Sequence, residues 1–254
     1  MQLALGLLLS AGIGLSLGLI GGGGSIITVP VLVYVLAVPV DQAIAMSLAV
    51  VGSTALVGAL LHGRRDAVAW RTGALFASSG IVTAYLGSRL TQKVPPPVLL
   101  LIFAGLMLVA AAVLLVGKDP GPDAGPRPAS LPRSVLSGLG VGFLTGFLGV
   151  GGGFLIVPAL VLFGGLTMKQ AIGTSLLVIA VNCAAGLLGH VRDGDLDVTL
   201  ALLVAAVAVA GALLGTALSH RVHPAGLRRT FAWFVVAVAL FLIARNYNAV
   251  LWPR

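Results

Sequence analysis

The sequence contains no glutamate, a single cysteine and few charged residues of any kind. Only 9% of its 254 residues are charged, whereas 59% are hydrophobic and the mean hydropathy is +1.12. A soluble domain usually carries about 25% charged residues, so this chain has too few to cover a water-facing surface. Apolar spans of about 20 residues would fit into it about eight times. The composition therefore argues against a soluble domain and predicts an all-α polytopic membrane protein.

The positions of the charged residues also argue against several functions. No acidic residue lies in the middle of an apolar run, and Asp41 stands at the start of one. Cation carriers usually need a carboxylate inside the membrane, so a cation substrate is disfavoured. The net charge of +8 comes from Lys and Arg scattered between apolar runs. That distribution fits the positive-inside rule and does not support nucleic-acid binding.

Catalytic and metal-binding patterns are absent as well. The lone Cys183 excludes a disulfide framework, and with His62 and His190 it shows no metal-ligand spacing. The sequence has no HExxH, no GxSxG and no paired carboxylates. We therefore expect neither an enzyme nor a metal or other cofactor. Residues 1–20 lack the basic region and cleavage site of a signal peptide and are expected to form a retained first segment.

An internal repeat organises the whole chain. Shifted by 128 residues, the sequence matches itself without a gap, so that six of the seven glycines of residues 12–24 fall on glycines of residues 140–152. The same shift aligns a proline, a Gln-Ala-Ile triplet, a histidine and an arginine, which biased composition alone would not do. We predict a first membrane repeat at residues 1–117 and a second at 133–254. A Pro- and Gly-rich linker, 118–132, joins them into one membrane domain.

Each repeat is predicted to contain about four helical segments. A Gly-rich apolar stretch comes first (3–37 and 133–166), and three helical runs follow it: 42–61, 68–90 and 96–117, then 170–189, 197–219 and 229–250. As one helix, the first stretch would reach about 52 Å, beyond a hydrocarbon core of about 30 Å. Two half-helices meeting at the glycines are therefore expected. Whether they cross the membrane or re-enter is open, but re-entry gives inverted repeats and the better positive-inside bias.

The contiguous glycines are the first candidate for substrate binding. Four or five small residues in a row make a poor helix, and an unwound backbone survives in a membrane only beside protein or a water-filled cavity. The half-helix that restarts there would point its N–H groups at an anion. The glycines could instead serve close packing, which we assign to Gly14, Gly18, Gly142 and Gly146. The candidates are Gly22, Gly23, Gly24, Ser25 and Thr28, with Gly151, Gly152 and Gly153.

Small polar residues on the following helix are the second candidate. They are Ser47, Ser53 and Thr54 in the first repeat and Thr174, Ser175 and Asn182 in the second. Single Ser and Thr residues more often join helices than bind ligands. Asn182 is costly to bury in an apolar run without a partner, so it should bond a neighbouring helix or a ligand.

A histidine and an arginine end this helix in both repeats. His62 with Arg64, and His190 with Arg192, could stand at the mouth of an anion pathway, where they would act in gating. An equally weighted reading makes them anchors at the membrane interface.

The doubled motif resembles that of a known family. Gly-x-x-Gly-x-Gly-Gly, a proline six residues on, then Gln-Ala-Ile-x-x-Ser-Leu and a helix-ending histidine are similar to the sulfite exporter TauE/SafE family. The resemblance covers nearly the whole chain. It implies a multi-pass permease of the bacterial inner membrane for small sulfur anions such as sulfite, thiosulfate or an organosulfonate, for example sulfoacetate.

The expected partners are therefore a small-molecule anion and membrane lipid, with no nucleic acid, and a homodimer is one arrangement left open. The leading hypothesis is a secondary transporter that alternates access around the two glycine breaks. A passive anion channel and a non-transporting membrane subunit are the alternatives. The second of these would not need two broken helices.

Overall fold

The computed structural model is built from helices. It describes residues 2–22, 24–63, 68–91, 93–116, 131–148, 153–162, 164–190, 197–218 and 224–251, and these ranges contain ten helices and no strand. In the first half they are α1 (Gln2–Ile20), α2 (Ser25–Tyr34), α3 (Val40–Gly63), α4 (Trp70–Thr91) and α5 (Pro96–Val116). In the second half they are α6 (Leu131–Leu148), α7 (Gly153–Leu162), α8 (Met168–His190), α9 (Val198–Leu218) and α10 (Pro224–Leu251).

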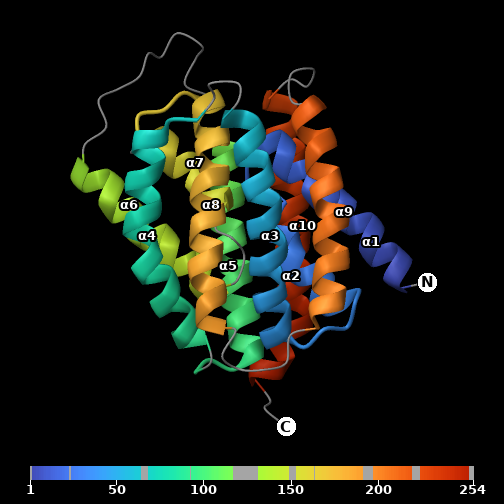
Figure 1. The fold of residues 1–254 in the computed structure, drawn as a ribbon. Coiled ribbons are helices and arrows are strands. Elements are labelled where there is room, and N and C mark those ends of the chain that lie inside the picture. The colour runs from blue at the N-terminus through green and yellow to red at the C-terminus, as the bar shows by residue number, and fades with distance from the viewer. Residues whose placement is uncertain are drawn as a thin grey trace.

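The long helices stand side by side as a bundle, while α1 and α6 lean outward on opposite sides of it (Figure 1). Helices far apart in sequence are neighbours, because α1 packs on α9 and α6 on α4. The bundle also pairs α3 with α8 and α5 with α10. Every helix from one half thus meets a helix from the other, which makes the two halves a single packed unit.

Glycines allow these helices to approach closely. An added Cβ on Gly14 or Gly18 would run into the backbone of α9 at Ala208 and Ala212. The same is true of Gly142 and Gly146 against α4, at Gly80 and Ala84. Small residues let helix backbones come together where lipid provides no hydrophobic drive. The prediction that these four glycines serve packing is confirmed.

The first Gly-rich stretch turns back on itself. An added Cβ on Gly24 would meet the backbone of Ile13, and one on Gly6 would lie 2.5 Å from a methyl carbon of Leu36. Leu36, just after the end of α2, therefore lies beside the start of α1. Gly21 provides the turn with φ +78°, a left-handed conformation that glycine adopts at little cost. Within the bundle, α1 and α2 thus form a hairpin.

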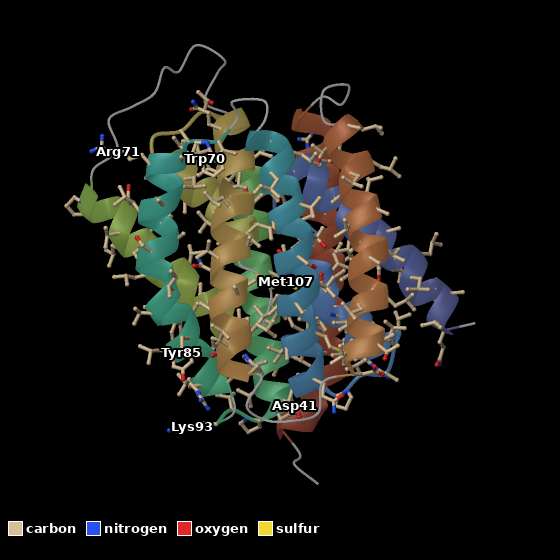
Figure 2. All side chains as sticks on the ribbon, viewed as in Figure 1. Asp41, Trp70, Arg71, Tyr85, Lys93 and Met107 are labelled. Atoms are coloured by element: carbon tan, nitrogen blue, oxygen red, sulfur yellow. The ribbon has the colours of Figure 1, made fainter. Side chains whose placement is uncertain are left out.

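The outside of the bundle is apolar and its charges lie toward the ends. Large exposed side chains such as Leu60, Leu188 and Leu202 are more than half exposed. In Figure 2, Trp70 and Arg71 lie at one end, Asp41 and Lys93 at the other, and Met107 between them. Four helices of the described residues are long and apolar enough to cross a membrane: Gln2–Ile20, Val40–Gly63, Gln170–His190 and Val198–Leu218. This surface suits lipid and not water.

The predicted helical runs agree with α3, α4, α5, α8, α9 and α10, with ends that differ by a few residues. The largest difference is at α10, which begins at Pro224, where proline suits the first turn. Residues 118–130 of the predicted linker lie outside the described residues. The last two linker positions are helical, because α6 begins at Leu131.

Candidate functional site

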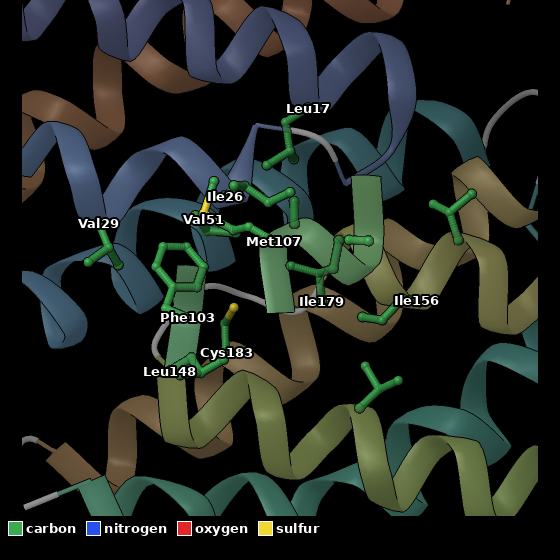
Figure 3. Packing of buried hydrophobic residues seen from close by; sticks show 14 of the residues in the cluster. Leu17, Ile26, Val29, Val51, Phe103, Met107, Leu148, Ile156, Ile179 and Cys183 are labelled. Carbon is green, nitrogen blue, oxygen red and sulfur yellow. The ribbon is translucent and has the colours of Figure 1, made fainter. Parts of the chain in front are cut away.

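Gly22 and Gly153, one from each Gly-rich stretch, meet in the interior of the bundle. An added Cβ on Gly153 would lie 2.6 Å from the Cα of Gly22, and one on Gly22 would overlap the Gly153 carbonyl group. Contacts this short leave no room for any side chain. Around them lies an apolar core, in which Leu17, Ile26, Ile156, Ile179 and Met107 come together from five helices (Figure 3). Gly23, Gly151 and Gly152 lie outside the described residues.

The half-helix after the first break starts in this buried setting. Gly24 stands at its N-cap and no side chain caps it. The Ser25 hydroxyl donates to the Gly22 carbonyl at 2.8 Å and the Thr28 hydroxyl to the Gly24 carbonyl at 3.3 Å. Both residues are fully buried. Because the hydroxyls serve backbone carbonyls, they leave the N–H groups at this helix start without a side-chain acceptor, an arrangement that favours an anion.

Two corresponding serines differ in their bonding. The Ser175 hydroxyl on α8 donates to the carbonyl of Gly21 at 2.6 Å and lies 2.8 Å from the Ile172 carbonyl. Its bond to Gly21 ties the first break to a helix of the other half. Ser47 occupies the corresponding position on α3, is equally buried, and has no hydrogen-bond partner. A buried hydroxyl left unpaired costs about 1–3 kcal/mol.

Asn182 is a buried amide, and both of its polar atoms lack a hydrogen-bond partner among the described residues. Its side chain is fully buried, and neither its Nδ2 nor its Oδ1 has a hydrogen-bond partner. The amide packs directly on α4, because an added Cβ on Gly80 would lie 2.5 Å from Oδ1 and 2.8 Å from Nδ2. Of the two expected partners of Asn182, a neighbouring helix or a ligand, no helix of the described residues provides a hydrogen bond. A donor and an acceptor without partners remain at this point.

The other predicted polar residues have structural contacts. Thr54 donates to the Val50 carbonyl at 2.6 Å, and Thr174 accepts a bond of 2.8 Å from the backbone N–H of Ala69, just before α4. Ser53 is exposed, on the same helix face as the exposed Leu56, so it does not belong to the buried group. Thr54 and Thr174 are buried.

The two histidines have matching environments at the ends of α3 and α8. His62 Nδ1 lies 3.0 Å from the Gly58 carbonyl, and His190 Nδ1 lies 3.0 Å from the Gly186 carbonyl. A carbonyl can only accept, so Nδ1 carries the proton in both rings. Both side chains are largely buried. Arg64 and Arg192, their predicted companions, lie outside the described residues.

Two polar contacts that fasten the half-helices were not predicted. Asn246 Nδ2 donates to the Tyr34 hydroxyl at 2.7 Å, which attaches the end of α2 to α10. Thr91 donates to the Phe147 carbonyl at 2.7 Å, which attaches α4 to the end of α6. Thr91 and Asn246 stand near the ends of apolar runs, where polar residues are ordinary, so the sequence offered no signal for them.

An apolar helical bundle that buries uncapped backbone and unpaired polar side chains at its centre belongs to the class of polytopic membrane transport proteins. The comparisons with known proteins agree, and they also give the family. A model described as sulfite exporter TauE/SafE matches residues 6–242, and the chain belongs to that family.

Curated relatives match this chain over most of its length. A probable membrane transporter protein of Xylella fastidiosa strain 9a5c is 35% identical over 242 residues, which cover 92% of each chain. YdhB of Bacillus subtilis, also named a probable membrane transporter protein, is 27% identical over 80% of this chain and 84% of its own. A third, MJ0441 of Methanocaldococcus jannaschii, is 24% identical over 91% of both chains. No solved structure matches.

Proposed function

We propose that this protein is a secondary transporter of a small sulfur-containing anion, such as sulfite, thiosulfate or an organosulfonate like sulfoacetate. It alternates access around its two glycine breaks, in the inner membrane of a bacterial cell. One observation carries the proposal: the backbones of Gly22 and Gly153, one from each half, touch at the buried centre of the bundle. Irregular backbone at such depth is tolerated only at functional cavities or inside protein.

Inverted repeats are part of this proposal, and paired contacts support them. An added Cβ on Gly58 would lie 3.0 Å from Leu176, and one on Gly186 would lie 3.3 Å from Leu48. These two contacts exchange places under the shift of 128 residues. A pair of corresponding helices that meet in this way run in opposite directions, so the two halves would sit in the membrane with opposite orientation.

The charge around the centre favours an anion. The two carboxylates among the described residues, Asp41 and Asp197, lie at helix starts, and Asp41 stands at one end of the bundle (Figure 2). Asp197 caps α9, since its carboxylate accepts the N–H of Leu200 at 2.9 Å. The buried centre thus offers helix N-termini and neutral donors with no described acidic group to oppose a negative substrate.

In this proposal the arrangement of the helices corresponds to a closed state, and the burial of the candidate residues supports it. Ser25, Thr28, Ser47, Ser175 and Asn182 are all fully buried, so neither side of the membrane has access to them. Substrate can reach the breaks only if the two halves move apart. Alternating access requires such a movement, first toward one side and then toward the other.

The proposal is tested by uptake of labelled sulfite, thiosulfate and sulfoacetate into proteoliposomes. Gly22→Ala should abolish saturable uptake, because its Cβ would overlap the backbone of Gly153. Gly12→Ala is the matched control on the preceding helix, since its Cβ would meet nothing within 4 Å. If folded protein takes up none of the three anions, the sulfur-anion assignment is wrong. If Gly22→Ala transports as well as Gly12→Ala, the breaks are not the site.

A further inference from the structure

Asn182 lies on the helix face that contacts both glycine breaks. Along α8, Ser175 bonds the Gly21 carbonyl, and the Cδ1 of Ile179 would lie 2.7 Å from a Cβ added to Gly153. Asn182 follows Ile179 by three residues, so it is one turn further on the same face. The unpaired amide therefore stands beside the proposed pathway and not at a distant helix contact.

The two halves differ in a compensating way at this point. The positions that correspond to Asn182 and Gly80 are Thr54 and Ala208. Where α8 meets α4, a larger polar residue, Asn182, thus faces the smallest possible neighbour, whereas the corresponding positions on α3 and α9 hold a smaller polar residue and alanine. Thr54 satisfies its hydroxyl on its own helix through the Val50 carbonyl, whereas the Asn182 amide satisfies nothing. If Asn182 served packing alone, threonine at this position and alanine in place of Gly80 would suffice.

We infer that Asn182 is the specificity-determining residue of the proposed transporter and that it selects oxyanions carrying a hydrogen-bond donor of their own. The inference rests on the proposed function. Nδ2 of the amide can donate to an anion oxygen, while Oδ1 can only accept, so one ligand satisfies both atoms only if it accepts and donates. Hydrogen sulfite and hydroxyalkyl sulfonates have this chemistry. Fully deprotonated oxyanions without a hydroxyl group leave Oδ1 unpaired.

Space for such a ligand would open between α4 and α8. In the closed structure the Asn182 amide packs on Gly80 of α4. Gly142 of α6 also packs on Gly80, because a Cβ added to Gly142 would overlap the Gly80 backbone. Because Gly80 and Gly142 have no side chains, Asn182 can separate from α4 with the least loss of side-chain contact. A ligand entering there would replace a contact that satisfies no hydrogen bond.

The chain itself supplies the variant that tests this role. Asn182→Thr combined with Gly80→Ala gives the contact between α8 and α4 the residues found at the corresponding positions of α3 and α9, so the amide is removed and the space on Gly80 is filled by a methyl group. The ligands are a matched pair, isethionate and ethanesulfonate, which differ by one hydroxyl group. They compete with whichever labelled sulfur anion the unmodified protein takes up into proteoliposomes, and the thermal midpoint of each protein is measured in detergent.

In the unmodified protein, isethionate should compete at least about tenfold better than ethanesulfonate, because a site built to bond a hydroxyl rejects the analogue without it. The double variant should lose this preference and unfold at the same or a higher temperature. If the unmodified protein shows no preference for isethionate, or if the double variant keeps that preference, the inference is wrong. Measured uptake would still support the proposed transport function in that case. A lower thermal midpoint would show that the amide is structural. If no anion is taken up at all, the proposed function fails together with the inference.

Discussion

One pair of corresponding residues differs where the backbone leaves a helix in the left-handed conformation. Ala37 has φ 55°, while its counterpart is Gly165 with φ 65°. A left-handed conformation costs an L residue roughly 1–2 kcal/mol and glycine almost nothing. Ala37→Gly should therefore raise the free energy of unfolding by up to about 1 kcal/mol, and Gly165→Ala should lower it by a similar amount. Thermal unfolding in detergent measures both, and shifts in the same direction would contradict the strain.

The two corresponding serines allow a second comparison at this scale. Ser175→Ala removes the bond to the Gly21 carbonyl and leaves that carbonyl without its serine donor, which should cost about 1–3 kcal/mol. Ser47→Ala removes a hydroxyl that has no partner, so stability should stay the same or rise. The measurement is again the thermal midpoint of each variant. Equal losses would mean that the bond to Gly21 contributes nothing specific.

Helix elements depend on the glycine contacts between the halves. Gly146→Ala would press a methyl group into the backbone of α4 at Ala84, and overpacking of this kind costs about 1–3 kcal/mol. Gly140→Ala, on the same helix, meets nothing within 4 Å and should be tolerated. Thermal unfolding of the two variants checks this prediction. If both are equally stable, α6 does not need its close approach to α4.

The sequence predicts where the helices lie along the chain more fully than it predicts which helices pack together. The runs that became α3, α4, α8 and α9 are long, apolar and bounded by loop residues, so hydropathy alone locates them. The Gly-rich stretch was ambiguous, because its residues allow both a crossing and a return. Contacts such as Gly24 with Ile13 make it a hairpin within the bundle, and only the folded chain contains them.

The candidate site was predicted unevenly for a related reason. Residue type marked Asn182 and Ser175 as polar groups in apolar helices, and both are fully buried. Ser53 has the same type but faces outward beside Leu56, since residue type does not say which face of a helix is covered. The contact between Gly22 and Gly153 joins residues from different halves, and no local pattern predicts it.

The whole molecule is proposed to contain two halves of opposite orientation in the membrane. Trp70 and Val198 are corresponding residues at the starts of α4 and α9, and both are more than half exposed. Trp70→Cys and Val198→Cys, each combined with Cys183→Ala, should react with an impermeant maleimide from opposite sides of oriented vesicles. Reaction of both from the same side would contradict inverted repeats.

The central claim is that the halves alternate around the touching breaks, and counterflow tests it most directly. Proteoliposomes are loaded with an unlabelled substrate anion, and the initial rate of uptake of the same labelled anion is compared with that of empty vesicles. A carrier returns faster when loaded, so the account predicts accelerated, saturable uptake that Gly22→Ala abolishes and Gly12→Ala retains. Uptake that is unaffected by loading and does not saturate would identify a channel and contradict alternating access.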